Sequence, residues 1–226
     1  MTDRTIRSKW ERRFREGSYP TNPDPSPVLR RYMSAAPDGR ALDVATGTGR
    51  NAIALAEAGY TVDAVDLART GLAIARGNAA DVGVDDRINW IQGDLSTYGL
   101  PAERYALVTV SFFRCLDRFT DLIEAITPGG YLFVEHHLRS TDPTPGGSSD
   151  PRYRLAANEL LRASLGLTVL HYDEGTERPP DGKSRATARV VARKSTGSRQ
   201  SYPTRTVGVD ADDEGTGPSR RGGERS

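Results

Sequence analysis

The chain has 226 residues, with 31 basic and 30 acidic side chains, a formal net charge of +1 and a single cysteine, Cys115. This length suffices for one sizeable hydrophobic core with a lid or tail besides. A charge so close to zero argues against a nucleic-acid partner, and a lone cysteine excludes an internal disulfide and fits a reducing compartment. We find neither a signal-peptide pattern nor the roughly 18–20 consecutive apolar residues of a membrane span, so we expect a cytoplasmic protein with no membrane contact.

Residues 1–36 predict a helical cap in front of the main domain. Ile6, Trp10 and Phe14 recur every four residues among charged neighbours, which is typical of an amphipathic helix. A proline-rich stretch follows, and a serine and a proline at its end favour the start of a second short helix over 27–34.

From residue 37 to 194 the pattern alternates between strand and helix, which favours a mostly parallel sheet with helices on both faces. We expect parallel strands over 41–46, 61–66, 87–92, 105–111 and 131–135, and helices over 51–58, 69–82, 116–126 and 152–165. Pro128-Gly129-Gly130 reads as a tight turn before the fifth strand. Two last strands, over 167–172 and 186–192, are separated by a short turn-rich link and predict an antiparallel hairpin at the sheet edge.

The segment 195–226 is rich in Gly, Ser, Arg and Asp and has very few large apolar residues. Such a segment cannot bury enough surface to offset its ordering entropy. We therefore predict a disordered tail from residue 195 onward.

The most informative stretch is Ala41-Leu-Asp-Val-Ala-Thr-Gly-Thr-Gly-Arg50, a buried strand that breaks into a glycine-rich turn before a helix. Gly47 and Gly49 can adopt positive φ and let the backbone approach a ligand, while the following helix presents its free N–H groups. Asp43, inside the strand, is expected to face that ligand. A carboxylate suits a cationic ligand better than a pyrophosphate, and S-adenosylmethionine carries both a sulfonium and an ammonium group.

Two further carboxylates follow the second and third strands. Ligands of open parallel sheets bind outside the carboxyl ends of the strands, so this spacing gathers Asp43, Asp66 and Asp94 at one edge. Asp66 stands where an acid accepts hydrogen bonds from ribose hydroxyls. Asp94 can accept from an adenine amine, with Leu95 packed on the ring. Each of these acids alone could instead be a helix N-cap.

Over about residues 26–193 the sequence resembles the class I S-adenosylmethionine-dependent methyltransferases. Residues 43–49 resemble that family's first motif, with Ala45 where glycine is usual; Asp66 matches its ribose-binding acid, residues 93–95 its adenine motif and 127–132 its turn into strand five. The resemblance implies a Rossmann-like fold with strand order 3-2-1-4-5-7-6 and S-adenosylmethionine as cofactor. It also implies a set of cofactor-binding residues: Asp43, Ala45, Gly47, Gly49, Asn51, Asp66, Leu67, Asp94, Leu95 and Ser111.

Two other hypotheses remain open. Gly47-x-Gly49-x-x-Ala52 also satisfies a relaxed dinucleotide fingerprint, so an NAD-dependent oxidoreductase is possible, although Asp43 would oppose a pyrophosphate. A non-catalytic regulatory protein that binds S-adenosylmethionine is the other.

The methyl acceptor is expected to be a small molecule, because the segment after the fourth strand, Ser111-Phe-Phe-Arg-Cys115, lacks the Asn/Asp-Pro-Pro-Tyr motif of amino-methylating nucleic-acid enzymes. Cys115 is better explained by packing than as a nucleophile. The residues around Trp10, Gly49-Arg-Asn-Ala52 and Glu135-His-His137 resemble the tellurite-resistance and thiopurine-like group, which acts on soft sulfur, selenium or tellurium nucleophiles. We expect a monomer or homodimer.

Arg114, His136 and His137 are the candidate catalytic residues, since all three lie at strand ends near the acceptor side. Arg114 could hold an anionic acceptor and a histidine could act as a general base, unless each is merely a polar group at a strand end. Adjacent histidines on a strand point to opposite faces, so at most one should face the pocket, and we expect no metal. Trp10, Phe14 and Tyr19 would form a lid or simply pack over the sheet edge.

Overall fold

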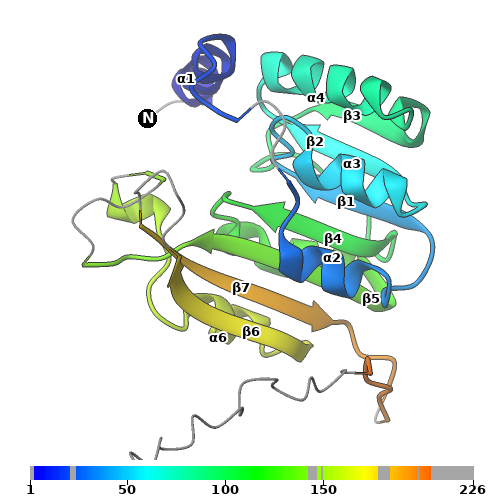
Figure 1. The fold of residues 1–226 in the computed structure, drawn as a ribbon. Coiled ribbons are helices and arrows are strands. Elements are labelled where there is room, and N and C mark those ends of the chain that lie inside the picture. Colours follow the sequence, from blue (N-terminus) through cyan, green and yellow to red (C-terminus); the bar gives the residue numbers. More distant parts are fainter. Residues whose placement is uncertain are drawn as a thin grey trace, which may run out of the picture.

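One sheet of seven strands organises the protein, in the order β3-β2-β1-β4-β5-β7-β6 (Figure 1). This computed structural model describes residues 3–20, 24–141, 147–148, 150–177, 184–197 and 199–204. The first five strands are parallel, and β7 is antiparallel to both β5 and β6. The strand order and the edge hairpin are therefore confirmed. The strands are β1 (Arg40–Val44), β2 (Thr61–Asp66), β3 (Ile88–Gln92), β4 (Tyr105–Ser111), β5 (Ile126–His137), β6 (Thr168–Glu177) and β7 (Arg185–Arg193).

Helices cover both faces of this sheet. They are α1 (Asp3–Arg15), α2 (Pro27–Met33), α3 (Arg50–Glu57), α4 (Arg69–Asp81), α5 (Phe119–Ala125) and α6 (Glu159–Ser164), with short 3-10 turns at Asp85–Arg87, Leu116–Arg118 and Pro151–Tyr153. Because alternate strand residues point to opposite faces, the core divides into two clusters. One includes Phe133 and side chains of α2 and α3, and the other includes Leu132 and side chains of α5 and α6.

Strand β5 is longer than the sequence predicts. Pro128-Gly129-Gly130 lies inside it instead of forming a turn before it, because the backbone of this stretch pairs with the end of β7 and the residue after it. The Gly129 N–H donates to the Lys194 carbonyl at 3.0 Å, and Lys194 donates back to Gly130 at 2.9 Å. The irregularity appears as a shift in the register between β4 and β5, and a Cβ on Gly130 would lie 2.7 Å from Ile126.

The helix expected over 152–165 is wrong in its first half. Only Glu159–Ser164 is α-helical; before it come the 3-10 turn Pro151–Tyr153 and a single parallel bridge between Leu155 and Leu138. Leu155 donates to the His137 carbonyl and accepts from the Arg139 N–H, both at 2.9 Å. Asn158, in the left-handed region at φ 61°, turns the chain into the helix.

The start of the C-terminal segment packs on the domain. The Arg193 guanidinium donates to Gln200 at 2.9 Å and lies 5.6 Å from the ring centre of Tyr202. The tail expected to be disordered from residue 195 therefore makes contacts up to this point, whereas 205–226 lie outside the described residues.

The carboxyl ends of the parallel strands share one edge of the sheet. In Figure 1, α1 and the segment that follows β5 both lie on the side of this edge. In the described part of the chain, no helix is long and apolar enough to cross a membrane.

Candidate functional site

The carboxylate of Asp66, at the end of β2, joins two loops of the carboxyl edge. Its Oδ2 accepts a 2.8 Å hydrogen bond from the Gly47 N–H, and its Oδ1 accepts one of the same length from the Ala68 N–H. Burial raises the pKa of Asp66 to about 6, although these two hydrogen bonds lower it. Asp66 is thus held in one orientation at the rim of the site and retains lone pairs for a ligand.

Asp43 does not face a ligand as expected. Its side chain lies within the protein, with the residue only 1% exposed, and its two oxygens accept hydrogen bonds from the hydroxyls of Thr46 at 2.5 Å and Thr109 at 2.6 Å. Burial raises the pKa of Asp43, and these hydrogen bonds oppose the rise. The position therefore supports the glycine-rich turn from behind, because an interior strand residue has no solvent-facing side.

The turn itself contains three residues with positive φ: Ala45 at 53°, Gly47 at 58° and Gly49 at 91°. Ala45 pays a steric cost there that glycine would avoid. Gly49 is the N-cap of α3, and a Cβ on it would lie 3.0 Å from the Cβ of Ala75 in α4. Gly49 thus allows the close packing of two helices, whereas Gly47 is buried beneath the rings of Tyr19 and Phe14.

The remaining predicted cofactor residues surround this turn. Asn51 donates to the Ser111 hydroxyl at 2.9 Å and so connects α3 to the end of β4. Leu67 is half-buried after β2. Asp94 accepts from the Ser96 N–H at 2.9 Å, which fixes the loop after β3. Leu95 is 6% exposed and belongs to the core cluster, so its packing on a ring stays a prediction.

The cap places aromatic rings on the turn. A Cβ on Gly47 would lie 3.6 Å from the Tyr19 ring and 3.8 Å from the Phe14 ring, and these rings contact each other and Trp10 with centroid distances of 5.2–6.2 Å. The Thr48 hydroxyl donates to the Pro20 carbonyl at 2.9 Å. The cap therefore covers the space in front of the turn.

Glu11 and Gly71 anchor this cap, and sequence reasoning missed both. The Glu11 carboxylate accepts hydrogen bonds from the N–H groups of Arg69 and Thr70 and from the Thr70 hydroxyl, at the N-terminus of α4. A Cβ on Gly71 would lie 2.9 Å from the Phe14 ring. The available signals were an acid on the polar face of the first helix and a glycine inside the fourth.

The three candidate catalytic residues lie on different faces of the sheet. Arg114 pairs with Glu159 of α6 at 3.2 Å, and His136, 3% exposed, donates from Nε2 to the Tyr153 carbonyl at 2.8 Å. Burial and the nearby arginines lower the pKa of His136. Both residues therefore belong to the face that α5 and α6 cover.

His137 lies on the opposite face, toward α3, as the alternation of side chains along a strand predicts. Which histidine faces an acceptor stays a prediction. Its ring stacks on Phe112 with 4.6 Å between centroids, and burial and neighbouring cations lower its pKa to about 4. Phe112 also contacts the Arg50 guanidinium, whose Cζ lies 5.3 Å from the centre of the Phe112 ring. Arg50 in turn hydrogen-bonds to Glu135.

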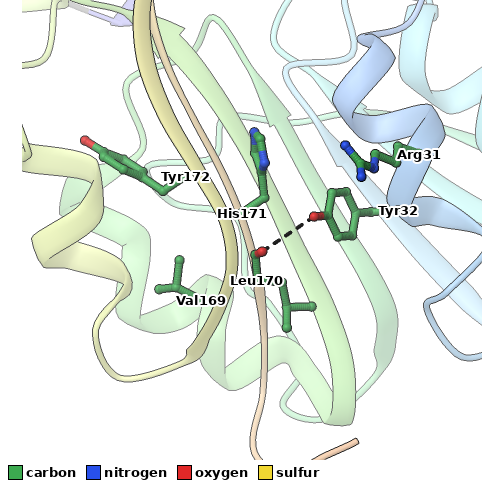
Figure 2. A pocket seen from close by; sticks show the side chains of 6 residues that line it. All are labelled: Arg31, Tyr32, Val169, Leu170, His171 and Tyr172. Atoms are coloured by element: carbon green, nitrogen blue, oxygen red, sulfur yellow. Dashed lines mark hydrogen bonds between the residues drawn. The ribbon is translucent and has the colours of Figure 1, made fainter. Parts of the chain in front are cut away.

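Other candidate chemistry is weak. Cys115 is 4% exposed in the core, and burial raises its pKa to about 12, so the thiol stays protonated. Within the described ranges no group of three or more potential ligands is arranged to hold a metal ion. Figure 2 shows a shallow cavity of about 320 Å³ between α2 and the edge strand β6, which contains Tyr32 and His171 and none of the predicted site residues.

We expect Glu11→Ala to loosen the cap without unfolding the domain. The substitution removes the acceptor of two α4 N–H groups, and a hydrogen bond to a charged group contributes about 1.5–3 kcal/mol. Hydrogen exchange should accelerate in α1 and at Arg69 and Thr70, while the amides of β1 and β4 stay protected. Unchanged exchange in α1 would show that the aromatic contacts alone hold the cap. Glu16→Ala is the matched control, because it removes an exposed carboxylate just after α1, whereas the hydrogen bonds to the N-terminus of α4 come from Glu11.

Comparison with known proteins agrees with this geometry. Residues 41–130 match a family model described as a methyltransferase domain. A demethylmenaquinone methyltransferase of Clavibacter sepedonicus is 30% identical over 111 residues, which cover 47% of this chain and 43% of that protein. A ribosomal protein L11 methyltransferase of Desulfitobacterium hafniense is 44% identical over 61 residues, which cover 27% of this chain and 20% of that protein. The chain thus spans less than half the length of these relatives.

Among solved structures, TehB from Haemophilus influenzae is similar with a TM-score of 0.64 and 20% identity, over 75% of this chain and 62% of that one. At this identity the likeness shows the fold. The region that matches the family model includes the turn around Gly47, strand β2 with Asp66, and the loop with Asp94. Residues 41–130 therefore resemble a methyltransferase domain, and the likeness to TehB agrees with the observed fold.

Proposed function

We propose that the protein transfers a methyl group from S-adenosylmethionine to a small-molecule acceptor at the carboxyl edge of the sheet. The observation that carries the proposal is the Asp66 carboxylate, fixed by the Gly47 and Ala68 N–H groups beneath an aromatic cap. Hydroxyl groups of a ribose would donate to its remaining lone pairs.

The residues present fit this cofactor. A carboxylate at the rim and the faces of Phe14 and Tyr19 are surroundings that favour a positively charged ligand. Gly47 has no side chain between its backbone and the rings of the cap. Asp66 would hold the ribose, Asp94 and Leu67 the adenine side, and the cap would cover the methionine side.

The protein's own part in the reaction is to align two molecules and exclude water. When bound, S-adenosylmethionine would supply a methyl carbon bonded to a positively charged sulfur. The acceptor would bond to this carbon while the sulfur keeps the electron pair of the broken bond. Correct alignment alone can account for several kcal/mol of the barrier. The cap, anchored by Glu11 on α4 and by Thr48 on Pro20, would shield the site from solvent.

The histidines favour an acceptor that needs no general base. His136 already uses Nε2 on the Tyr153 carbonyl, and a base with a pKa of about 4, such as His137, cannot deprotonate an alcohol efficiently at neutral pH. A soft nucleophile that ionises by itself, such as an acidic thiol or a metalloid species, fits these residues best. The proton of a thiol would leave to solvent before transfer, so the thiolate is the species that bonds to carbon.

The pKa of Asp66 gives a pH-dependence for cofactor binding. A carboxyl whose pKa is raised to about 6 in the folded protein is ionised at pH 7 and mostly protonated at pH 5. Because ribose hydroxyls need the ionised form as acceptor, the affinity for S-adenosylhomocysteine should fall about tenfold from pH 7 to pH 5. Isothermal titration calorimetry measures this directly.

The variant Asp66→Asn is the control for that titration. We expect it to bind more weakly, by about ten- to a hundredfold, because a charged acceptor is lost, and to show a flat affinity between pH 5 and 7. The same pH-dependence in wild type and variant would assign the titration to another group.

Acceptor preference can be tested with three compounds that share one skeleton: 4-mercaptobenzoate, 4-hydroxybenzoate and 4-aminobenzoate. With labelled S-adenosylmethionine we expect methylation of the thiol only, with a rate that follows ionisation of the thiol. The rate should survive His136→Gln, since this residue faces the other side of the sheet. Methylation of the hydroxyl or the amine would contradict the choice of a soft nucleophile.

A further inference from the structure

A buried charge network lies beside the proposed cofactor site, on the face of the sheet toward α3. Arg50, the first residue of α3, hydrogen-bonds to Oε1 of Glu135, and the Glu135 side chain is only 3% exposed. Glu135 stands opposite Ser111 of β4 and Arg189 of β7 in the register of the sheet. The contact with Glu135 holds the Arg50 guanidinium over the Phe112 ring, at the carboxyl ends of β4 and β5.

The charges in this network are unevenly paired. Arg189 has two carboxylates of its own, Asp173 at 3.2 Å and Glu177, and lies 3.5 Å from Glu135. Among the residues that the structure describes, Glu135 is the one carboxylate that forms a salt bridge with Arg50. A buried ion pair is expensive to desolvate and adds little stability over apolar packing. A guanidinium has five N–H donors, so Arg50 keeps donors that this one contact does not use.

Two polar groups on the same face lack a partner. The Thr187 hydroxyl, in a residue 1% exposed, and Nδ1 of His137 make no hydrogen bond within the part of the chain that the structure describes. The two residues are directly opposite in the pairing of β5 with β7, two positions along from Glu135 and Arg189. An unsatisfied buried polar group costs free energy, so a bound molecule that hydrogen-bonds to both groups would be stabilised.

Cations lie near His137, although the neighbouring network also holds the carboxylates of Glu135, Asp173 and Glu177. The charged side chains that act on His137 are Arg154 and Arg185, which add to the effect of burial and keep the imidazole neutral. The Arg50 guanidinium lies against the Phe112 ring, which also stacks on His137. The Arg50 side chain is 18% exposed, and its unused N–H donors favour a negatively charged ligand over a neutral one.

We propose that the wall formed by Arg50, Phe112, His137 and Thr187 binds the methyl acceptor and that this acceptor carries a negative charge. Arg50 is its anion-binding residue, His137 and Thr187 hydrogen-bond to it, and Glu135 is a positioning residue that holds Arg50. This inference rests on the proposed function and adds the charge of the substrate to it.

The test compares two probes that differ only in charge, 4-mercaptobenzoate and 4-mercaptobenzamide, titrated into the full chain saturated with S-adenosylhomocysteine. We expect the wild type to bind the carboxylate at least about tenfold more tightly, which corresponds to one charged hydrogen bond. Arg50→Gln should bring this ratio close to one while the affinity for S-adenosylhomocysteine changes less than about twofold. Glu135→Gln should lower the ratio at least about threefold, whereas a purely structural role would weaken both probes alike.

Arg40→Gln is the matched control. Arg40 is a half-buried arginine that pairs with a buried carboxylate, Asp63 at 2.7 Å, at the amino edge of the sheet. The variant Arg40→Gln should retain the wild-type ratio between the affinities for the two probes. Arg50→Lys, which keeps the charge, should restore part of the preference that Arg50→Gln loses.

Three outcomes would overturn the inference. They are an unchanged ratio in Arg50→Gln, no binding of either probe at about 5 mM, and a loss of S-adenosylhomocysteine affinity in Arg50→Gln. The last would assign Arg50 to the carboxylate of the cofactor. A wild-type protein that does not bind S-adenosylhomocysteine at all would instead reject the proposed function itself.

Discussion

The Asp66 carboxylate, hydrogen-bonded to the N–H groups of Gly47 and Ala68, is the interaction on which the rest of the site depends. It joins the loop after β1 to the loop after β2, and these are the two loops that a nucleoside would bridge. Asp43 supports the same turn from the interior through Thr46 and Thr109. Both carboxylates are buried but serve different purposes: Asp43 shapes the turn from behind, and Asp66 joins two loops of the edge through their backbone N–H groups.

Strand β5 separates two chemical environments at this edge. His136 lies with Arg114 on the side of α5 and α6, where both have protein partners. His137 lies with Arg50 and Glu135 on the side of α3, next to the glycine-rich turn. Since successive strand residues alternate, His136 and His137 cannot act together. The proposed acceptor site uses the α3 side.

The strand order and the hairpin at the edge followed from local patterns, because strand and helix periods and glycine-rich turns depend on nearby residues. Contacts between distant residues did not. The partnership of Arg50 with Glu135 spans 85 positions, and that of Glu11 with Thr70 spans 59, so neither leaves a local signal. The Pro-Gly-Gly stretch pairs with Lys194 at the far end of the domain, which explains why it reads as a turn in isolation. Ala45 did leave a local signal: it stands where the family usually has glycine, and its φ of 53° is one that favours glycine.

The most direct test of this account is calorimetric titration of the full chain at pH 7 with S-adenosylhomocysteine and, separately, with NADH. Both ligands present ribose hydroxyls to an acid such as Asp66, so the ribose alone does not distinguish them. Because the Gly47 N–H already donates to the Asp66 carboxylate beneath aromatic rings, the turn should bind the first ligand and reject the pyrophosphate of the second. Binding of NADH without S-adenosylhomocysteine would contradict the account and move the site to dinucleotide chemistry.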